Sequence, residues 1–105
     1  MSDIDVIDRV ETVVITKVIK PKKYAVLLHN DDFTPMEFVV VVLEKIFNKG
    51  AEDAVEVMLT IHKSGKAAVG LYSKEIAEQK VFDTEEFARI NDYPLKATIE
   101  EQGED

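Results

Sequence analysis

Three stretches of the chain carry the spacing of apolar and polar residues that is typical of β-strands. In residues 23–29, apolar side chains occupy both sides of the alternation, as in a strand at the centre of a sheet. Residues 67–72 form a second, shorter apolar run. From Leu95 to Glu100 apolar and polar residues alternate strictly, which predicts a third strand with one exposed face.

Three other segments have the three- and four-residue spacing of amphipathic helices. The first, residues 35–48, contains a valine-rich run that also has high strand propensity. Its start signals favour a helix, because Thr34 is expected to be the N-cap, with Pro35 at the first helical position and Glu37 completing a capping box. Gly50 is expected to be its C-cap.

The second and third predicted helices cover residues 51–63 and 74–90. Gly65 is expected to end the second, Ser73 to be the N-cap of the third, and Pro94 to block further helix. The residues expected to share one side of the second helix are Ala54, Met58, Ile61 and His62. Those expected to face inward from the third are Ile76, Ala77, Val81, Phe87 and Ala88.

This order of elements, β-α-α-β-α-β, predicts an α+β fold. Its simplest packing is a small three-stranded antiparallel sheet covered on one face by three helices. We expect the folded core to span residues 21–100. Residues 1–20 are expected to form a mobile arm with some strand propensity, and residues 101–105 a short acidic tail.

Composition narrows the classes of function. The 105 residues include 21 acidic and 13 basic side chains, a net charge of −8 that disfavours binding to nucleic acid and to anionic membranes. No cysteine is present, which excludes disulfides and thiolate sites. The first residues are acidic rather than basic, and no apolar run reaches the roughly 20 residues of a membrane span. We therefore expect a cytoplasmic protein.

Asn30, Asp31 and Asp32 lie between the first strand and the first helix. Their oxygen acceptors suit a ligand that brings hydrogen-bond donors or positive charge. Asn and Asp are also ordinary turn residues that bond their own backbone, so composition alone leaves both interpretations open.

Two enzyme-like interpretations lack a necessary part. His62 and Asp31 could form a base and its orienting carboxylate, but the nearest hydroxyl, Thr34, is expected to be an N-cap. A metal site drawing on His29, Asp32 and these two residues has no recognisable ligand spacing. The sequence therefore predicts a binding protein with no catalytic residue, no metal and no cofactor.

Four motifs now point to a family. Residues 24–39 (YAVLLHNDDFTPMEFV) resemble the signature of the ClpS adaptors, the bacterial N-degron recognition proteins. Residues 58–62 (MLTIH), with Gly65-Lys66 after them, resemble the second motif of that family. Residues 77–81 (AEQKV) and Tyr93-Pro94-Leu95 follow in the expected order, so the similarity covers about residues 21–100.

The resemblance implies an adaptor that captures proteins whose first residue is Leu, Phe, Tyr or Trp and delivers them to a Clp AAA+ unfoldase. It implies that Asn30, Asp31 and His62 receive the N-terminal amine, which offers three donors and a charge. The residues implied to form the pocket for the first side chain are Thr34, Met36, Val39, Met58, Ile61 and Leu95. Those implied to face the N-terminal domain of a ClpA-like unfoldase are Glu75, Glu78 and Lys80.

Two features depart from the family pattern. Residues 6–19 are rich in Val and Ile where the family's tail is typically polar, and Asn91-Asp92 lacks a histidine often seen before Tyr93. Two other interpretations stay open at this point: a protein-interaction module resembling a ribosomal stalk C-terminal domain, without N-degron specificity, and a small hydrolase.

Overall fold

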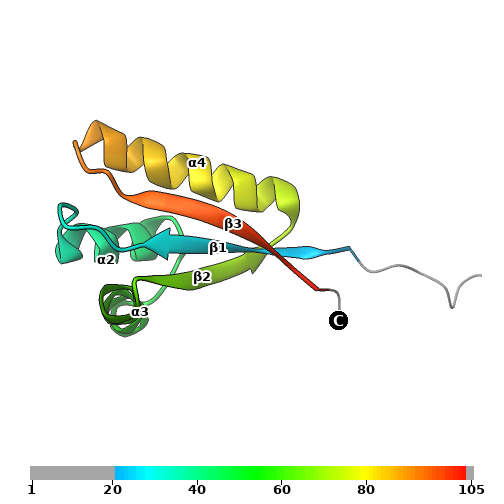
Figure 1. Ribbon diagram of the computed structural model, residues 1–105, viewed down its shortest axis with the longest axis horizontal. Coiled ribbons are helices and arrows are strands. Elements are labelled where there is room, and N and C mark those ends of the chain that lie inside the picture. Colours follow the sequence, from blue (N-terminus) through cyan, green and yellow to red (C-terminus); the bar gives the residue numbers. More distant parts are fainter. Residues whose placement is uncertain (1–20, 104–105) are drawn as a thin grey trace, which may run out of the picture.

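The computed structural model describes residues 21–103, and the arm expected at residues 1–20 lies outside this range. The elements, in chain order, are β1 (Lys23–His29), α2 (Met36–Lys45), α3 (Ala51–Ser64), β2 (Lys66–Tyr72), α4 (Lys74–Ile90) and β3 (Lys96–Gln102). The three strands form one antiparallel sheet in the order β2-β1-β3, and Figure 1 shows their arrangement with the helices. The predicted fold and the central position of the first strand are confirmed.

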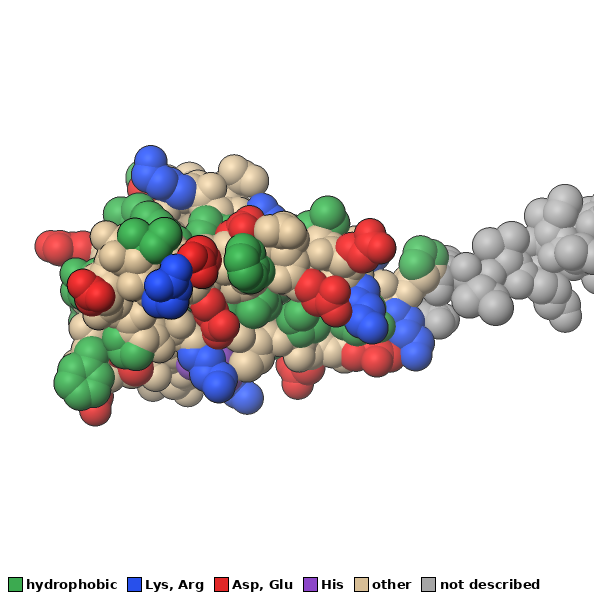
Figure 2. Space-filling model, turned by 90° about the horizontal axis from the view of Figure 1, so that it is seen from above, with side chains coloured by type: hydrophobic (Ala, Val, Ile, Leu, Met, Phe, Trp, Pro, Cys, Tyr) green, Lys and Arg blue, Asp and Glu red, His purple; other side chains and the backbone are tan. Residues whose placement is uncertain are grey.

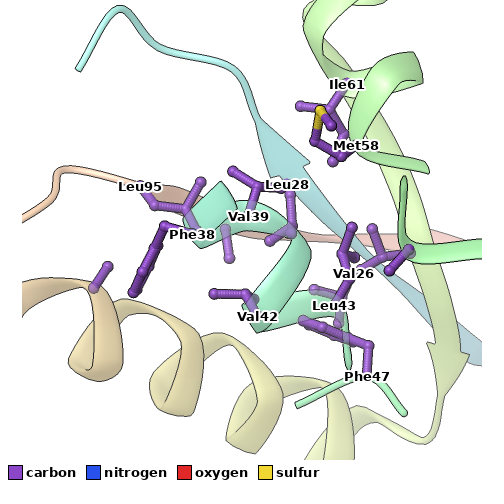
Figure 3. Packing of buried hydrophobic residues seen from close by; sticks show 14 of the residues in the cluster. Val26, Leu28, Phe38, Val39, Val42, Leu43, Phe47, Met58, Ile61 and Leu95 are labelled. Carbon is purple, nitrogen blue, oxygen red and sulfur yellow. The ribbon is translucent and has the colours of Figure 1, made fainter. Parts of the chain in front are cut away.

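The core lies between one face of the sheet and the three helices. Val26 and Leu28 on β1 are completely buried, and they pack with Val69 of β2 and Ala97 of β3. Figure 3 shows Phe38, Val39 and Val42 entering this core from α2, and Met58 and Ile61 from α3. Each such side chain contributes about 1.5–3 kcal/mol when it leaves water, so this cluster is the main source of stability.

The other face of the sheet carries no helix of the core. Ala25 and Leu27, which alternate with the core residues of β1, are buried without belonging to the core cluster. They face Leu71 and Ala68 of β2, and Leu71 is 59% exposed. Within residues 21–103 no helix packs on this side of the sheet, which is called the open face below.

A bulge in β2 brings a glycine under an aromatic ring. The β1–β2 register shifts between Val26 and Leu27, which leaves Val69 as the extra residue. Gly70 lies opposite Val26, and a Cβ at this glycine would overlap the ring of Tyr72. A side chain at position 70 would therefore have to displace the Tyr72 ring.

The start of α2 differs from the prediction. The Thr34 hydroxyl donates to Asp31 Oδ2 at 2.8 Å, and the N-cap is Pro35, whose carbonyl accepts the N–H of Phe38 and of Val39. A carboxylate is a stronger acceptor than a hydroxyl, and it binds the Thr34 side chain that would otherwise cap the helix. The predicted capping box is therefore wrong.

The end of α2 also differs. The helix ends at Lys45 with Ile46 as its C-cap, and Asn48 adopts the left-handed conformation at φ 57°. Gly50, expected to end α2, is instead the N-cap of α3 at φ −72°. Asn tolerates left-handed backbone because its short side chain can bond locally, so glycine was not needed for this stop.

The other helix boundaries follow the prediction. Gly65 ends α3 at φ 93°, and its N–H donates to the Ile61 carbonyl. The Ser73 hydroxyl accepts the Ile76 N–H at the start of α4. No helix within residues 21–103 combines the length and apolar composition needed to cross a membrane.

The inward face of α4 differs from the predicted one at Ile76. Ala77 and Ala88 are completely buried, and Val81 and Phe87 are half-buried, as expected. Ile76, expected to face inward, is 48% exposed, and the buried residue not foreseen is Thr84. One residue along an α-helix turns the side chain by more than a quarter of a turn, which carries Ile76 away from the stripe.

Candidate functional site

The turn between β1 and α2 is built around the Asp31 carboxylate. Its Oδ1 accepts the N–H groups of Phe33 at 2.8 Å and Thr34 at 2.7 Å, and its Oδ2 accepts the Thr34 hydroxyl at 2.8 Å. Partial burial alone would raise the pKa of the Asp31 carboxyl, but these hydrogen bonds outweigh it and leave the pKa below its ordinary value. The side chain is therefore a carboxylate anion at neutral pH.

This turn is tied to the end of α3. The Asn30 N–H donates to the Gly65 carbonyl at 2.8 Å, and Gly65 follows directly after the last residue of α3. His62 lies on the last turn of the same helix. The side chains of Asn30 and His62 are exposed and that of Asp31 is half-buried, so a ligand can reach this end of the molecule.

The residues predicted to form a pocket divide into a buried group and a surface group. Val39, Met58, Ile61 and Leu95 belong to the core cluster, and each exposes 9% or less of its surface. Thr34 is half-buried and Met36 is 43% exposed, and they lie at the start of α2. Four of the six predicted pocket residues are therefore core residues, and only Thr34 and Met36 reach the surface.

A shallow hollow elsewhere on the protein contains none of these residues. It has a volume of about 450 Å³ and is lined by Ala51, Glu52, Val55 and Glu56 on the first turns of α3. Its lining has no side chain that could fix the orientation of a ligand other than two exposed glutamates. None of the turn residues lines this hollow, and we assign it no role.

The surface of α4 carries the three residues predicted to contact an unfoldase. Glu75 and Glu78 are exposed, and Figure 2, which views the protein from the side of α4, shows acidic side chains interspersed with apolar ones. Lys80 is half-buried instead, and its Nζ donates to the Ile46 carbonyl at 2.6 Å. Its ammonium also lies 5.9 Å from the ring centroid of Phe47 and 5.7 Å from that of Tyr72.

Comparison with known proteins decides the family. The family model of the ATP-dependent Clp protease adaptor protein ClpS matches residues 19–98. This chain belongs to the ClpS family. A ClpS adapter protein of Bdellovibrio bacteriovorus is 51% identical over 88 residues, which cover 84% of this chain and 77% of the relative. That of Roseobacter denitrificans is 54% identical over 83 residues, covering 79% and 74%.

A solved structure supports the same assignment. The structure of Agrobacterium tumefaciens ClpS2 bound to L-phenylalaninamide has a TM-score of 0.77 and 38% sequence identity, and the match covers 79% of this chain and 100% of that one. The chain is thus an adaptor of Clp protease by family, as the sequence motifs indicated. The stalk-like alternative is not supported.

Two exposed aromatic residues lie beside residues of the predicted sites, although neither was itself among the predicted site residues. Phe33, in the turn that holds Asp31, is 77% exposed, and Phe82, one turn after Glu78 on α4, is 62% exposed. The four-residue spacing of Phe82 from Glu78 could have indicated that both side chains lie on one side of the predicted helix. The position of Phe33, directly after the Asn-Asp-Asp run, could have indicated that it belongs to the turn.

Within residues 21–103, no group of three or more His, Asp and Glu side chains is placed to hold a metal ion.

Proposed function

We propose that this ClpS protein binds the first residue of proteins that begin with Leu, Phe, Tyr or Trp. It delivers them in the cytoplasm to a ClpA-like AAA+ unfoldase, and it works by binding, with no covalent step of its own. The observation that carries the proposal is the similarity to ClpS2 bound to L-phenylalaninamide. That ligand has a free α-amino group and an amide in place of the next peptide bond, so it resembles an N-terminal phenylalanine.

Asn30, Asp31 and His62 receive the ammonium group. A carboxylate offers about four lone-pair sites, and the turn occupies three of those of Asp31. One site is left for a donor of the ligand, and the charge of the carboxylate balances that of the ammonium. The Asn30 side-chain carbonyl and a ring nitrogen of His62 supply acceptors for the two other donors.

The first side chain of the bound protein lies against an apolar floor. Val39, Met58, Ile61 and Leu95 present only hydrocarbon and a thioether, so a leucine or an aromatic ring leaves water on binding there. Thr34 and Met36 form the wall and the mouth. An apolar floor with one polar rim favours large apolar first residues over small or charged ones.

The unfoldase contacts α4 through Glu75, Glu78 and Lys80. The two glutamates are exposed and free to meet basic groups of a partner. The Lys80 ammonium donates to the Ile46 carbonyl, so this side chain both contacts the unfoldase and holds α4 against the end of α2.

Peptide titration tests the binding function. A peptide beginning with Leu or Phe should bind, and the same peptide with an acetylated N-terminus should not, since acetylation removes the charge and two donors. Equal affinity of the free and acetylated peptides would contradict the proposal. At the site, Asp31→Asn and His62→Ala should each weaken binding by about tenfold or more, the effect expected for a hydrogen bond to a charged group. The matched control is Asp32→Asn, at the exposed acid beside Asp31, which should leave affinity unchanged.

A further inference from the structure

Three basic side chains lie in one row across the end of the sheet. His29, the last residue of β1, pairs with Lys66, the first residue of β2, and with Lys96, the first residue of β3. Residues directly opposite one another in antiparallel strands project from the same face, so the two lysines flank the imidazole. We call these three residues the cationic row.

The row projects from the open face. Leu28 points into the core, and His29, one residue further, therefore points to the opposite side. The His29 Nε2 lies 2.8 Å from the Thr98 hydroxyl, and this hydrogen bond holds the ring between the lysines. Lys66 and Lys96 are both exposed.

The charge of the row is not neutralised locally. Within residues 21–103 neither lysine forms an ion pair. Two carboxylates of neighbouring segments are engaged in other hydrogen bonds, because Asp31 is bonded by its own turn and the Glu85 Oε2 accepts the Ala97 N–H at 3.0 Å. In a chain of net charge −8, the two neighbouring lysines create a local positive field that opposes the charge of the whole molecule.

The row borders the site proposed for the amine. His29 precedes Asn30, and Lys66 follows Gly65, whose carbonyl accepts the Asn30 N–H. An extended peptide advances about 3.3 Å per residue, and we place the residues that meet the row about two to four positions after the first one. The amine site offers hydrogen-bond acceptors that suit an ammonium group, whereas the neighbouring row offers donors that suit a carboxylate.

We propose that the cationic row selects acidic residues in the segment that follows the first residues of the bound protein. This inference rests on the proposed function, and it concerns substrate residues that do not enter the pocket. The occupant is the substrate chain because the row is continuous with the amine site. Without the row, the net charge of the protein would repel an acidic segment.

Paired peptides test the preference. Two Leu-initiated peptides of about ten residues differ only in carrying Glu or Gln at two positions between the third and the sixth. The wild-type protein should bind the Glu peptide roughly three- to fivefold more tightly, the size expected for solvent-exposed charge pairs. The ratio should fall as salt is raised above about 0.15 M, where the screening length is about 8 Å.

Variants distinguish the effect of the cationic row from the effect of the net charge of the protein. The double variant Lys66→Gln, Lys96→Gln should lose the preference for Glu and keep its affinity for the Gln peptide. A matched control is Lys74→Gln with Lys23→Gln, two exposed lysines at the other end of the strands, which removes the same charge and should keep the preference. Equal binding of both peptides by the wild type, or the same loss in the control, would overturn the inference. If neither Leu-initiated peptide binds, the proposed function itself fails.

Discussion

At the scale of single residues, Asp31 has two tasks in this protein. It organises the turn through three hydrogen bonds, and it is proposed to face the amine of the substrate. A residue that bonds its own backbone and a residue that binds a ligand were alternative interpretations of the sequence. The geometry makes them compatible, because the turn leaves one acceptor position free.

The lowered pKa of Asp31 predicts a pH dependence of stability. The group is ionised in the folded protein at a pH where the unfolded chain, with its ordinary value of 3.8, is already protonated. Its stabilisation is therefore complete above that value and is lost as the pH falls through the lowered pKa. Urea unfolding from about pH 6 to about pH 2 should show a smaller acid loss in Asp31→Asn than in the wild type. Identical acid losses would show that this carboxyl contributes nothing to the pH dependence, and Asp32→Asn should behave as the wild type.

Met36 is predicted to restrict the shape of the first side chain. It is 43% exposed on the first turn of α2, and we propose that it lies at the mouth of the pocket. A long unbranched side chain there can contact Leu while crowding a branch at the ligand Cβ. Met36→Ala should therefore lower the ratio of affinities for Leu- and Ile-initiated peptides, by roughly three- to tenfold given about 1 kcal/mol of crowding. An unchanged ratio in peptide titrations would exclude Met36 as the gate, and Val55→Ala, at an exposed apolar residue of α3, is the control.

At the scale of elements, one side chain joins the end of α2 to α4. The Lys80 ammonium donates to the Ile46 carbonyl, the C-cap of α2, and lies near the rings of Phe47 and Tyr72. A cation at a helix C-terminus complements the carbonyl groups left without intrahelical partners. The two helices therefore support one another although the contact spans 34 residues of sequence.

This contact predicts a loss of stability when the charge is removed. Lys80→Met keeps most of the aliphatic stem but loses the hydrogen bond and the interaction with the rings, so the free energy of unfolding should fall by about 1–2 kcal/mol. Glu78→Gln, on the exposed side of the same helix, should change it by less than about 0.5 kcal/mol. Chemical denaturation of both variants provides the comparison. Equal stability of Lys80→Met and the wild type would mean that the contact does not support the fold.

At the scale of the whole molecule, ligand binding should raise the temperature of unfolding. A ligand that binds only the folded state stabilises it by about 2.7 kcal/mol at a hundred times its Kd, which for a domain of about 100 residues raises Tm by roughly 10 °C or more. L-Phenylalaninamide should produce this shift in a thermal melt. N-acetyl-L-phenylalaninamide, with no free amine, should not. A similar shift with both would indicate binding that does not involve Asn30, Asp31 and His62.

The sequence by itself determined the elements, their order and the family. The spacing of apolar residues and the positions of glycine, proline and capping residues are local properties. They predicted that β1 is the central strand, that α3 ends at Gly65 and that α4 begins after Ser73. The run from Asn30 to Met36 marked the turn that holds the candidate site. These features could be predicted because each depends on residues within a few positions of one another.

The tertiary structure alone decided which partners distant or competing groups take. Thr34 donates to a carboxylate instead of capping a helix, and Lys80 reaches a carbonyl on another helix. Strand pairing brings Lys66 and Lys96 to either side of His29, although the two lysines are 30 positions apart in the chain. The physical reason is that hydrogen bonds, burial and charge depend on distances across the fold, which no local pattern of residues contains.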